Sequence, residues 1–279
     1  MAPATLPKDT PKKPPESAGN QPETARLAIV GAGPGDPGLL TMRAYDLLQA
    51  ADTVVYDRLV SEEILALLPE KTARVFAGKA SRNHFVKQED INALLVDQAR
   101  TGKRVVRLKG GDPFIFGRGS EEAQHLAENG IPFEIVPGVT AATGCSARSA
   151  IPLTHRELSR SVTFVTGHLK NDGALDLNWT ALADPRGTAV IYMGLANSAE
   201  ISSQLIAHGL PGGTPAAIIE KGTTPDQRTV LTTVAALATA IETHGISSPA
   251  LLVIGQVAAM AETLNWASAL IQDKTRAEA

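Results

Sequence analysis

Three glycine-rich stretches, each directly after a short run rich in β-branched residues, have the clearest potential for ligand chemistry in this sequence. They are GAGPGD at 31–36, KGGDPFIFGRG at 109–119 and VPGVTAATGC at 136–145. Glycine lets the backbone approach a ligand closely and adopt left-handed turns. Because open parallel sheets bind ligands at the carboxyl ends of their strands, the three loops together predict one ligand site. Taken singly, each loop is also compatible with a plain turn between strand and helix.

The residues around the glycines limit the kind of ligand. The first loop departs from the dinucleotide motif GxGxxG because Asp36 occupies the position of its third glycine, where an acid would oppose a pyrophosphate. The second loop lacks the Gly-Lys-Ser/Thr ending of a phosphate-binding loop. Its carboxylate and three apolar residues suit a ligand with an apolar body, hydrogen-bonding groups and positive charge. S-adenosylmethionine has these properties.

Composition disfavours several other classes of function. The 279 residues include 26 Lys plus Arg and 29 Asp plus Glu, a net charge of −3, which argues against binding to nucleic acid through bulk charge. One cysteine, Cys145, and six scattered histidines predict neither a disulfide nor a metal site. The longest uncharged runs, 201–219 and 243–261, contain His, Pro, Gly and Ser, and the N-terminus lacks a signal-peptide core. We therefore expect a cytoplasmic protein without a membrane span.

The elements that must position these loops follow from hydrophobic periodicity. Strands are predicted at 27–30, 53–56, 74–77, 104–108 and 133–136, then at 162–165, 189–192, 216–219, 229–232 and 251–254. Helix-length amphipathic segments separate many of them, which predicts an α/β fold of two domains with mostly parallel sheets. The expected organisation is a disordered Pro-rich leader (1–25), an N-terminal domain (26–152), a C-terminal domain (160–265) and a polar tail (266–279).

Longer motifs give a resemblance to a known family. They include VGAGPGDPGLLT (30–41), VVRLKGGDPFIFGRGSEE (105–122), VPGVTAATGCSA (136–147), IPLTHR (151–156) and YMG (192–194). From about Leu27 to Val257 the chain resembles uroporphyrinogen-III C-methyltransferases of the tetrapyrrole methylase class. The resemblance implies two α/β domains with S-adenosylmethionine in the cleft between them, and a homodimer. It also implies methylation of uroporphyrinogen III at carbons 2 and 7, giving precorrin-2 and S-adenosylhomocysteine.

The resemblance also assigns cofactor contacts. They fall on Pro34, Gly110, Gly111, Asp112, Ile115, Thr140, Ala141, Met193 and Gly222. Backbone groups of the glycine-rich turns suit the methionine and ribose parts of the cofactor. Met193 alone would be expected to be a core methionine, but the surrounding YMG match favours packing against adenine.

Catalytic roles follow from the same resemblance and from the chemistry of methyl transfer. An electron-rich pyrrole carbon needs no covalent protein nucleophile, but its methylated product must lose a proton. The resemblance points to Asp57 as proton acceptor and Lys79 as proton donor. Arg118 is effectively always protonated, so we expect it to orient the substrate. Glu121, three residues further along, is expected to orient Arg118 or take a proton, although a helix-terminal charge explains it equally well. Lys79 is likewise compatible with a surface lysine.

The substrate carries eight carboxylates and calls for cationic ligands. Candidates are Arg58, Arg118, His155, Arg156 and His168, of which His155 and Arg156 stand beside the expected connection between the domains. Two alternatives stay open: a methylase of the same fold acting on a later precorrin, and a non-catalytic tetrapyrrole-binding module. Sirohaem, cobalamin and haem d1 are all open as destinations of the product.

Overall fold

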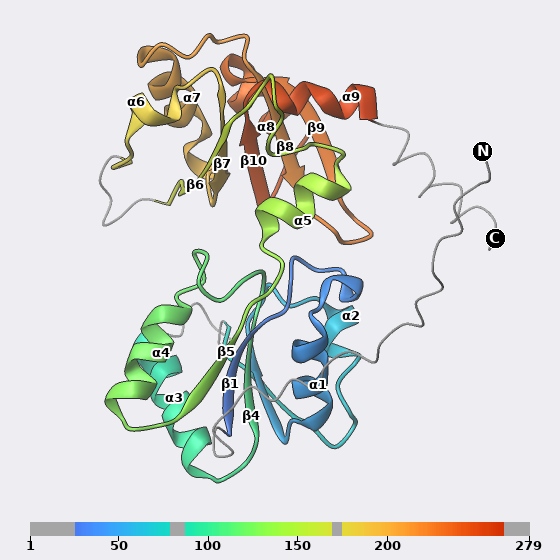
Figure 1. The fold of residues 1–279 in the computed structure, drawn as a ribbon, viewed down its shortest axis with the longest axis vertical. Helices are drawn as coiled ribbons and strands as arrows, with labels where there is room; N and C mark the ends of the chain where they lie inside the picture. The colour runs from blue at the N-terminus through green and yellow to red at the C-terminus, as the bar shows by residue number, and fades with distance from the viewer. Residues whose placement is uncertain (1–25, 79–86, 169–174, 265–279) are drawn as a thin grey trace, which may run out of the picture.

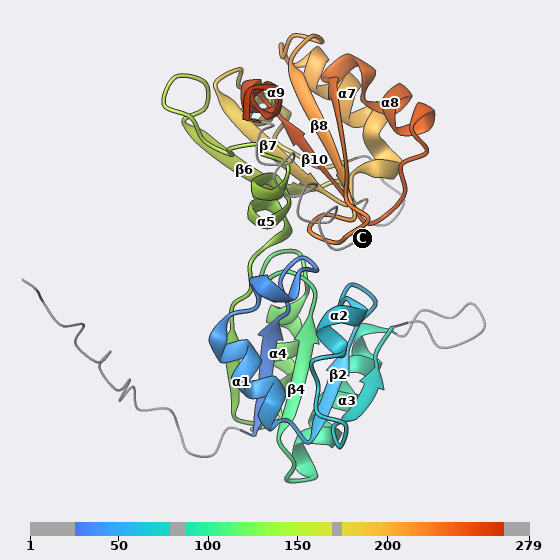
Figure 2. The same ribbon diagram turned by 90° about the vertical axis from the view of Figure 1, so that its right-hand side faces the viewer.

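The chain forms two five-stranded sheets with helices, placed one above the other along the long axis of the molecule (Figures 1 and 2). The computed structural model describes residues 26–78, 87–168 and 175–264. The expected leader at 1–25 and tail at 266–279 lie outside these residues. Within the described part of the chain, no helix has the length and apolar character required to cross a membrane.

The N-terminal sheet is entirely parallel, as predicted. Its strands are β1 (Leu27–Gly31), β2 (Thr53–Tyr56), β3 (Ala73–Phe76), β4 (Val105–Lys109) and β5 (Phe133–Val136), in the order β3-β2-β4-β1-β5. Since β1 leads to β2 on one side and β4 leads to β5 on the other, the ends of β1 and β4 form the switch point of the sheet. Open α/β sheets bind ligands at such points.

Helices cover both faces of this sheet (Figure 1). They are α1 (Met42–Ala50), α2 (Glu62–Leu65), α3 (Gln88–Arg100) and α4 (Gly119–Glu128). Apolar residues of α1 and α2 pack with Val54, Val106 and Leu108 on one face. Residues of α3 and α4 pack with Val55 and Val105 on the other. Strand β4 is therefore buried on both faces, and alternate residues of it point towards α3 and α4.

The C-terminal sheet is mixed, so the prediction of a mostly parallel sheet was wrong for this half. Its strands are β6 (Ser161–Thr166), β7 (Gly187–Tyr192), β8 (Pro215–Glu220), β9 (Arg228–Thr233) and β10 (Ala250–Ile254), in the order β6-β7-β10-β8-β9. Only β6 and β7 are parallel, and the other three pairs are antiparallel. Spacing between apolar runs does not specify strand direction. A connection of seven residues, 221–227, turns β8 back into β9, and β10 enters between β7 and β8 antiparallel to both.

Helices also cover both faces of the second sheet. On one face α6 (Trp179–Leu182), α7 (Ser198–Ala207) and α8 (Leu237–Thr243) contribute to the core, and on the other α5 (Ala141–Arg148) and α9 (Met260–Leu264) do so. Short 3-10 helices occupy Pro37–Leu39, Leu195–Asn197, Val234–Ala236 and Gln256–Ala259.

Helix α5 belongs to the packing of the second sheet. Its Ala142 and Cys145 are buried in one cluster with Val190, Ala217 and Leu251. The chain therefore passes from one sheet to the other between β5 and α5, ahead of the boundary at 152 that the sequence suggested. The small buried face of α5 fits either sheet by pattern alone, and tertiary packing decides between them.

Candidate active site

The three glycine-rich loops meet backbone to backbone at the ends of β1, β4 and β5. The amide of Gly111 donates to the carbonyl of Gly33 at 2.7 Å, and the amide of Gly33 donates to the carbonyl of Gly111 at 3.1 Å. A Cβ atom on Gly31 would lie 2.5 Å from the amide nitrogen of Gly138, and one on Gly138 would overlap the carbonyl oxygen of Gly111. Glycine is required here so that the loops can touch, which supports one shared site.

Asp112 ties the second loop to the third. Its Oδ1 accepts from the amide of Phe114 at 2.9 Å, and its Oδ2 accepts from the amide of Gly138 at 3.1 Å. Between these loops Gly111 has φ +68°, and the direction of its missing Cβ is open as far as the amide nitrogen of Ala141, 3.9 Å away. Asp112 thus braces the loops, while Gly111 leaves space beside the start of α5. These features fit a ligand that is held by backbone groups.

The end of β7 closes against the start of α5. The hydroxyl of Tyr192 lies 2.6 Å from Oγ1 of Thr140 and accepts from the amide of Ala142 at 2.9 Å. The ring of Phe116, from the second loop, lies 4.9 Å from the ring of Tyr192. Burial raises the pKa of Tyr192. The predicted cofactor residues Thr140 and Ala141 therefore lie beside Tyr192, and Met193 follows it with half of its surface exposed.

The first loop contacts the turn after β8. The amide of Asp36 donates to Oγ1 of Thr223 at 3.1 Å. A Cβ on Gly144 would lie 2.6 Å from Cγ of Pro34, and a Cβ on Gly222 would overlap the thiol of Cys145. The predicted contacts Pro34 and Gly222 are thereby brought to α5 from opposite sheets.

Backbone strain is concentrated in the same loops. Among the described residues, the non-glycine residues with positive φ are Phe116, Arg118, Ala150, Met193, Lys221 and Thr223. All but Ala150 belong to the second loop, to the end of β7 or to the turn after β8. Such conformations cost about 1–3 kcal/mol each and persist where the surrounding structure enforces them, which is typical of ligand sites.

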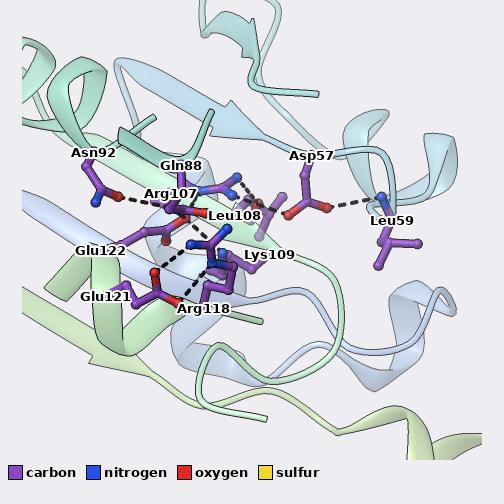
Figure 3. Close-up of polar contacts among 10 residues, drawn as sticks. All are labelled: Asp57, Leu59, Gln88, Asn92, Arg107, Leu108, Lys109, Arg118, Glu121 and Glu122. Carbon is purple, nitrogen blue, oxygen red and sulfur yellow. Dashed lines mark hydrogen bonds and ion pairs between the residues drawn. The ribbon is translucent and has the colours of Figure 1, made fainter. Parts of the chain in front are cut away.

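A chain of charged side chains runs from the buried side of α4 to the end of β2 (Figure 3). Lys109 Nζ and Arg107 Nε lie 2.9 and 3.1 Å from Oε1 of Glu122. Arg107 Nη2 lies 3.4 Å from Oδ2 of Asp57, whose other oxygen accepts from the amide of Leu59 at 3.0 Å. The side chains of Arg107, Lys109 and Glu122 are 3, 4 and 0 % exposed, and that of Asp57 is 27 % exposed.

Arg118 and Glu121 form a forked pair nearby (Figure 3). Arg118 Nε and Nη2 donate to the two oxygens of Glu121 at 2.9 and 2.6 Å, and both side chains are about half exposed. The bond to Arg118 lowers the pKa of Glu121, and the same bond raises the pKa of Arg118. Glu121 is therefore placed to hold Arg118.

His155 and Arg156 lie elsewhere. His155 pairs through the backbone with Ser159, whose hydroxyl lies 2.7 Å from Oγ1 of Thr188 near the start of β7. His155 and Arg156 line an open hollow of about 530 Å³, together with Arg160. Tyr192 is at the other end of β7, so the hollow and the glycine loops lie at opposite ends of this strand. Lys79 lies outside the described residues.

Four residues of this region were missed as site residues by the sequence analysis: Arg107, Glu122, Phe116 and Tyr192. A signal for Arg107 existed, because residues 105–109 form a buried strand in which two alternate positions are cationic. The role of Tyr192 had no such signal, since its hydroxyl acts on a helix that is distant in the sequence.

The model of the family described as Tetrapyrrole (Corrin/Porphyrin) Methylases matches residues 26–238 of this chain. The chain belongs to the tetrapyrrole methylases. A siroheme synthase from Chromobacterium violaceum is 53 % identical over 250 residues, which cover 90 % of this chain and 53 % of that protein. A siroheme synthase from Nitrosospira multiformis is also 53 % identical, over 251 residues. This tetrapyrrole methylase chain thus spans about half the length of those relatives.

Solved structures agree with this family. Uroporphyrin-III C-methyl transferase from Thermus thermophilus, complexed with S-adenosylhomocysteine, is 40 % identical with a TM-score of 0.70, over 83 % of this chain and 92 % of that one. A cobalt precorrin-4 methyltransferase is 31 % identical with a TM-score of 0.75, over 86 % of this chain and 99 % of that one. This tetrapyrrole methylase uses S-adenosylmethionine as its methyl donor.

Proposed function

We propose that this chain methylates uroporphyrinogen III at carbons 2 and 7, forming precorrin-2 and S-adenosylhomocysteine. The observation that carries the proposal is the placement of the Arg118–Glu121 pair and of Asp57 at the edge of the sheet where the three glycine loops meet. A fixed guanidinium suits a substrate rich in carboxylates, and a partly exposed carboxylate suits the loss of a proton. Similarity to the Thermus thermophilus enzyme supports the choice of substrate.

The cofactor supplies a methyl group made electrophilic by its sulfonium. We assign the backbone of Gly110, Gly111 and Ala141 to its methionine and ribose parts, and the exposed side chain of Met193 to its adenine. Pro34, Ile115, Thr140 and Gly222 are assigned to the walls of the same site. Asp112 acts by keeping the second and third loops together.

The reacting pyrrole carbon takes the methyl group while the bond from methyl carbon to sulfur breaks. Alignment of the two reactants is the main task of the protein. Arg118 orients a substrate carboxylate and is held by Glu121. Asp57 accepts the proton that the cationic methylated product loses, and Lys79 is assigned as proton donor. The position of Arg118 beside the glycine loops supports its role as a substrate ligand. The positions of His155 and Arg156 at the other end of β7 do not support direct contact with substrate in this site.

The test is anaerobic incubation of the purified chain with S-adenosylmethionine and enzymatically prepared uroporphyrinogen III. We expect a product that carries two added methyl groups by mass. Binding of S-adenosylhomocysteine without any methylated tetrapyrrole would overturn the proposal in favour of a binding module. Methyl transfer confined to a later precorrin would favour the second candidate, which similarity to the cobalt precorrin-4 methyltransferase supports. Sedimentation analysis of the same sample tests the homodimer that the resemblance implies.

A further inference from the structure

Glu122 is a fully buried carboxylate with an unusual set of partners. It stands in the first turn of α4, and its Oε1 receives bonds from Lys109, Arg107 and Gln88 at 2.9, 3.1 and 3.4 Å. Its Oε2 is buried and has no hydrogen-bond partner among the described residues. One oxygen thus collects three donors while the other collects none.

The buried charged cluster of Arg107, Lys109 and Glu122 occupies the space between β4 and α4, where apolar residues would be less costly to bury. Removing charged groups from water is costly, and a well-packed apolar set of similar volume is often as stable. Val105, on the same face of β4, packs within the apolar core and shows that this face can be filled by apolar side chains. Burial lowers the pKa of Lys109, and the nearby Arg107 lowers it further, in opposition to Glu122. Packing alone therefore does not account for three buried charges.

Arg107 connects this buried cluster to the proposed site. Its Nε binds Glu122 Oε1, its Nη1 donates to the carbonyl of Leu108 at 3.2 Å, and its Nη2 meets Asp57 Oδ2 at 3.4 Å. One planar guanidinium thus joins a buried carboxylate on α4 to a partly exposed carboxylate at the end of β2 (Figure 3). The contact with Asp57 is the longest of the three, so Arg107 is held mainly from the buried side.

We propose that Glu122 is a positioning residue that acts through Arg107 to orient Asp57 and to preserve its strength as a base. The inference rests on the proposed function, in which Asp57 accepts a proton. Glu122 and Asp57 are two carboxylates that pair with the guanidinium of Arg107. Without the negative charge of Glu122, Asp57 would be the carboxylate that remains beside the guanidinium. A tighter pair with Arg107 would stabilise the charged carboxylate and weaken it as a base.

The charged groups around Asp57 set the direction of the expected effect. Arg107 lies 3.4 Å from Asp57, and Lys109 on the same strand acts on it through its charge, whereas Glu122 lies on the other side of Arg107 (Figure 3). Replacing Glu122 by glutamine removes one negative charge from this group and keeps the shape of the side chain. The attraction between Arg107 and Asp57 should then strengthen.

The experiment compares Glu122→Gln, Glu122→Asp and the parent chain in the methyl-transfer assay over a range of pH. We expect Glu122→Gln to lower kcat about tenfold, less than the 100-fold or greater effect that general-base catalysis typically contributes. The KM for S-adenosylmethionine should stay unchanged. The acidic limb of the kcat profile should move to lower pH, and Glu122→Asp, which keeps the charge, should restore part of both changes.

A second readout does not need turnover. In protein labelled with ¹³C at aspartate carboxyl groups, the Asp57 signal, assigned with Asp57→Asn, should titrate at lower pH in Glu122→Gln. Asp52→Asn is the matched control, because Asp52 pairs with Arg104 at the opposite end of β2 and should move neither readout.

The outcomes separate the two levels of inference. If the parent chain forms no methylated product, the proposed function fails, whereas the carboxyl titration still tests the link from Glu122 to Asp57. If the parent is active and Glu122→Gln changes only thermal stability, with the pH limb and the Asp57 titration unmoved, Glu122 is structural and the inference is overturned. Should Glu122→Gln not fold, Glu122→Asp must show a smaller shift in the same direction, and an unchanged profile in that variant counts against the inference.

Discussion

The hydroxyl of Tyr192, the last residue of β7, lies 2.6 Å from Oγ1 of Thr140, the residue before α5. The same hydroxyl accepts a hydrogen bond from the amide of Ala142. A side chain from the second sheet therefore caps the N-terminus of α5, where the side chain of Thr140 makes no cap bond. Because β5 leads directly into α5, this contact fixes the point at which the chain changes sheets. It also fixes Thr140 and Ala141, two of the assigned cofactor contacts.

Replacing Tyr192 by phenylalanine should therefore affect stability and ligand affinity together. Loss of a cap bond costs about 1 kcal/mol, and the orphaned amide of Ala142 adds to this cost. We expect a lower midpoint of chemical denaturation and weaker binding of S-adenosylhomocysteine by calorimetry. Tyr45→Phe, an exposed tyrosine on α1, is the control and should change neither. Unchanged affinity in Tyr192→Phe would show that the cap does not reach the cofactor site.

Asp112→Ala should weaken binding of S-adenosylhomocysteine about tenfold. The substitution removes the acceptor of the exposed amide of Phe114 and of the part-buried amide of Gly138, and a lost hydrogen bond of this kind costs about 0.5–1.5 kcal/mol. Asp112→Asn retains one carbonyl acceptor and should lose less. Titration calorimetry of the three proteins measures the order, and equal affinities would exclude the bracing role.

Gly138→Ala should be severely destabilising. Its added methyl group would overlap the carbonyl of Gly111 and approach Cα of Gly31 at 2.8 Å, where neither backbone can move without opening the loops. We expect a loss of several kcal/mol in unfolding free energy, comparable to other overpacked or strained positions. Gly213→Ala is the comparison, because a Cβ there meets no atom within 4 Å.

Arg118→Ala should lower turnover and raise the KM for the tetrapyrrole while leaving the affinity for S-adenosylhomocysteine unchanged. The guanidinium is placed by its forked bond to Glu121 and takes no part in the contacts between the glycine loops. Arg118→Lys should recover little, because an ammonium cannot reproduce the two parallel bonds. Steady-state kinetics with each substrate varied in turn will show this, and a raised KM for S-adenosylmethionine alone would contradict it.

Cys145 should make stability fall at alkaline pH. Burial raises the pKa of its thiol from 9.0 to about 12, so the folded state keeps the proton where the unfolded state loses it. Stability from this group is complete below pH 9 and is lost as pH rises from about 9 towards 12. Unfolding free energies of the parent and of Cys145→Ala should differ in slope across that window. A thiol reagent should also label the parent much faster once it is denatured.

Much of the fold was accessible from periodicity. The strands at 53–56 and 133–136 have the predicted bounds, and the others shift by no more than two residues at either end. Strand direction in the second sheet was not accessible, since an apolar run reads the same in both directions. The partner of α5 was not accessible either, because its small buried residues fit either sheet.

The amino-acid sequence by itself determined the glycine loops, the parallel N-terminal sheet and the family, because each depends on residue types at short, fixed spacing. The tertiary structure alone decided that His155 and Arg156 lie away from the loops, and that Tyr192 caps α5. It also brought Glu122 to Arg107 and, through it, to Asp57. These relationships join residues from different strands and helices, and the energy of a buried charge or bond depends on neighbours that only folding brings into contact.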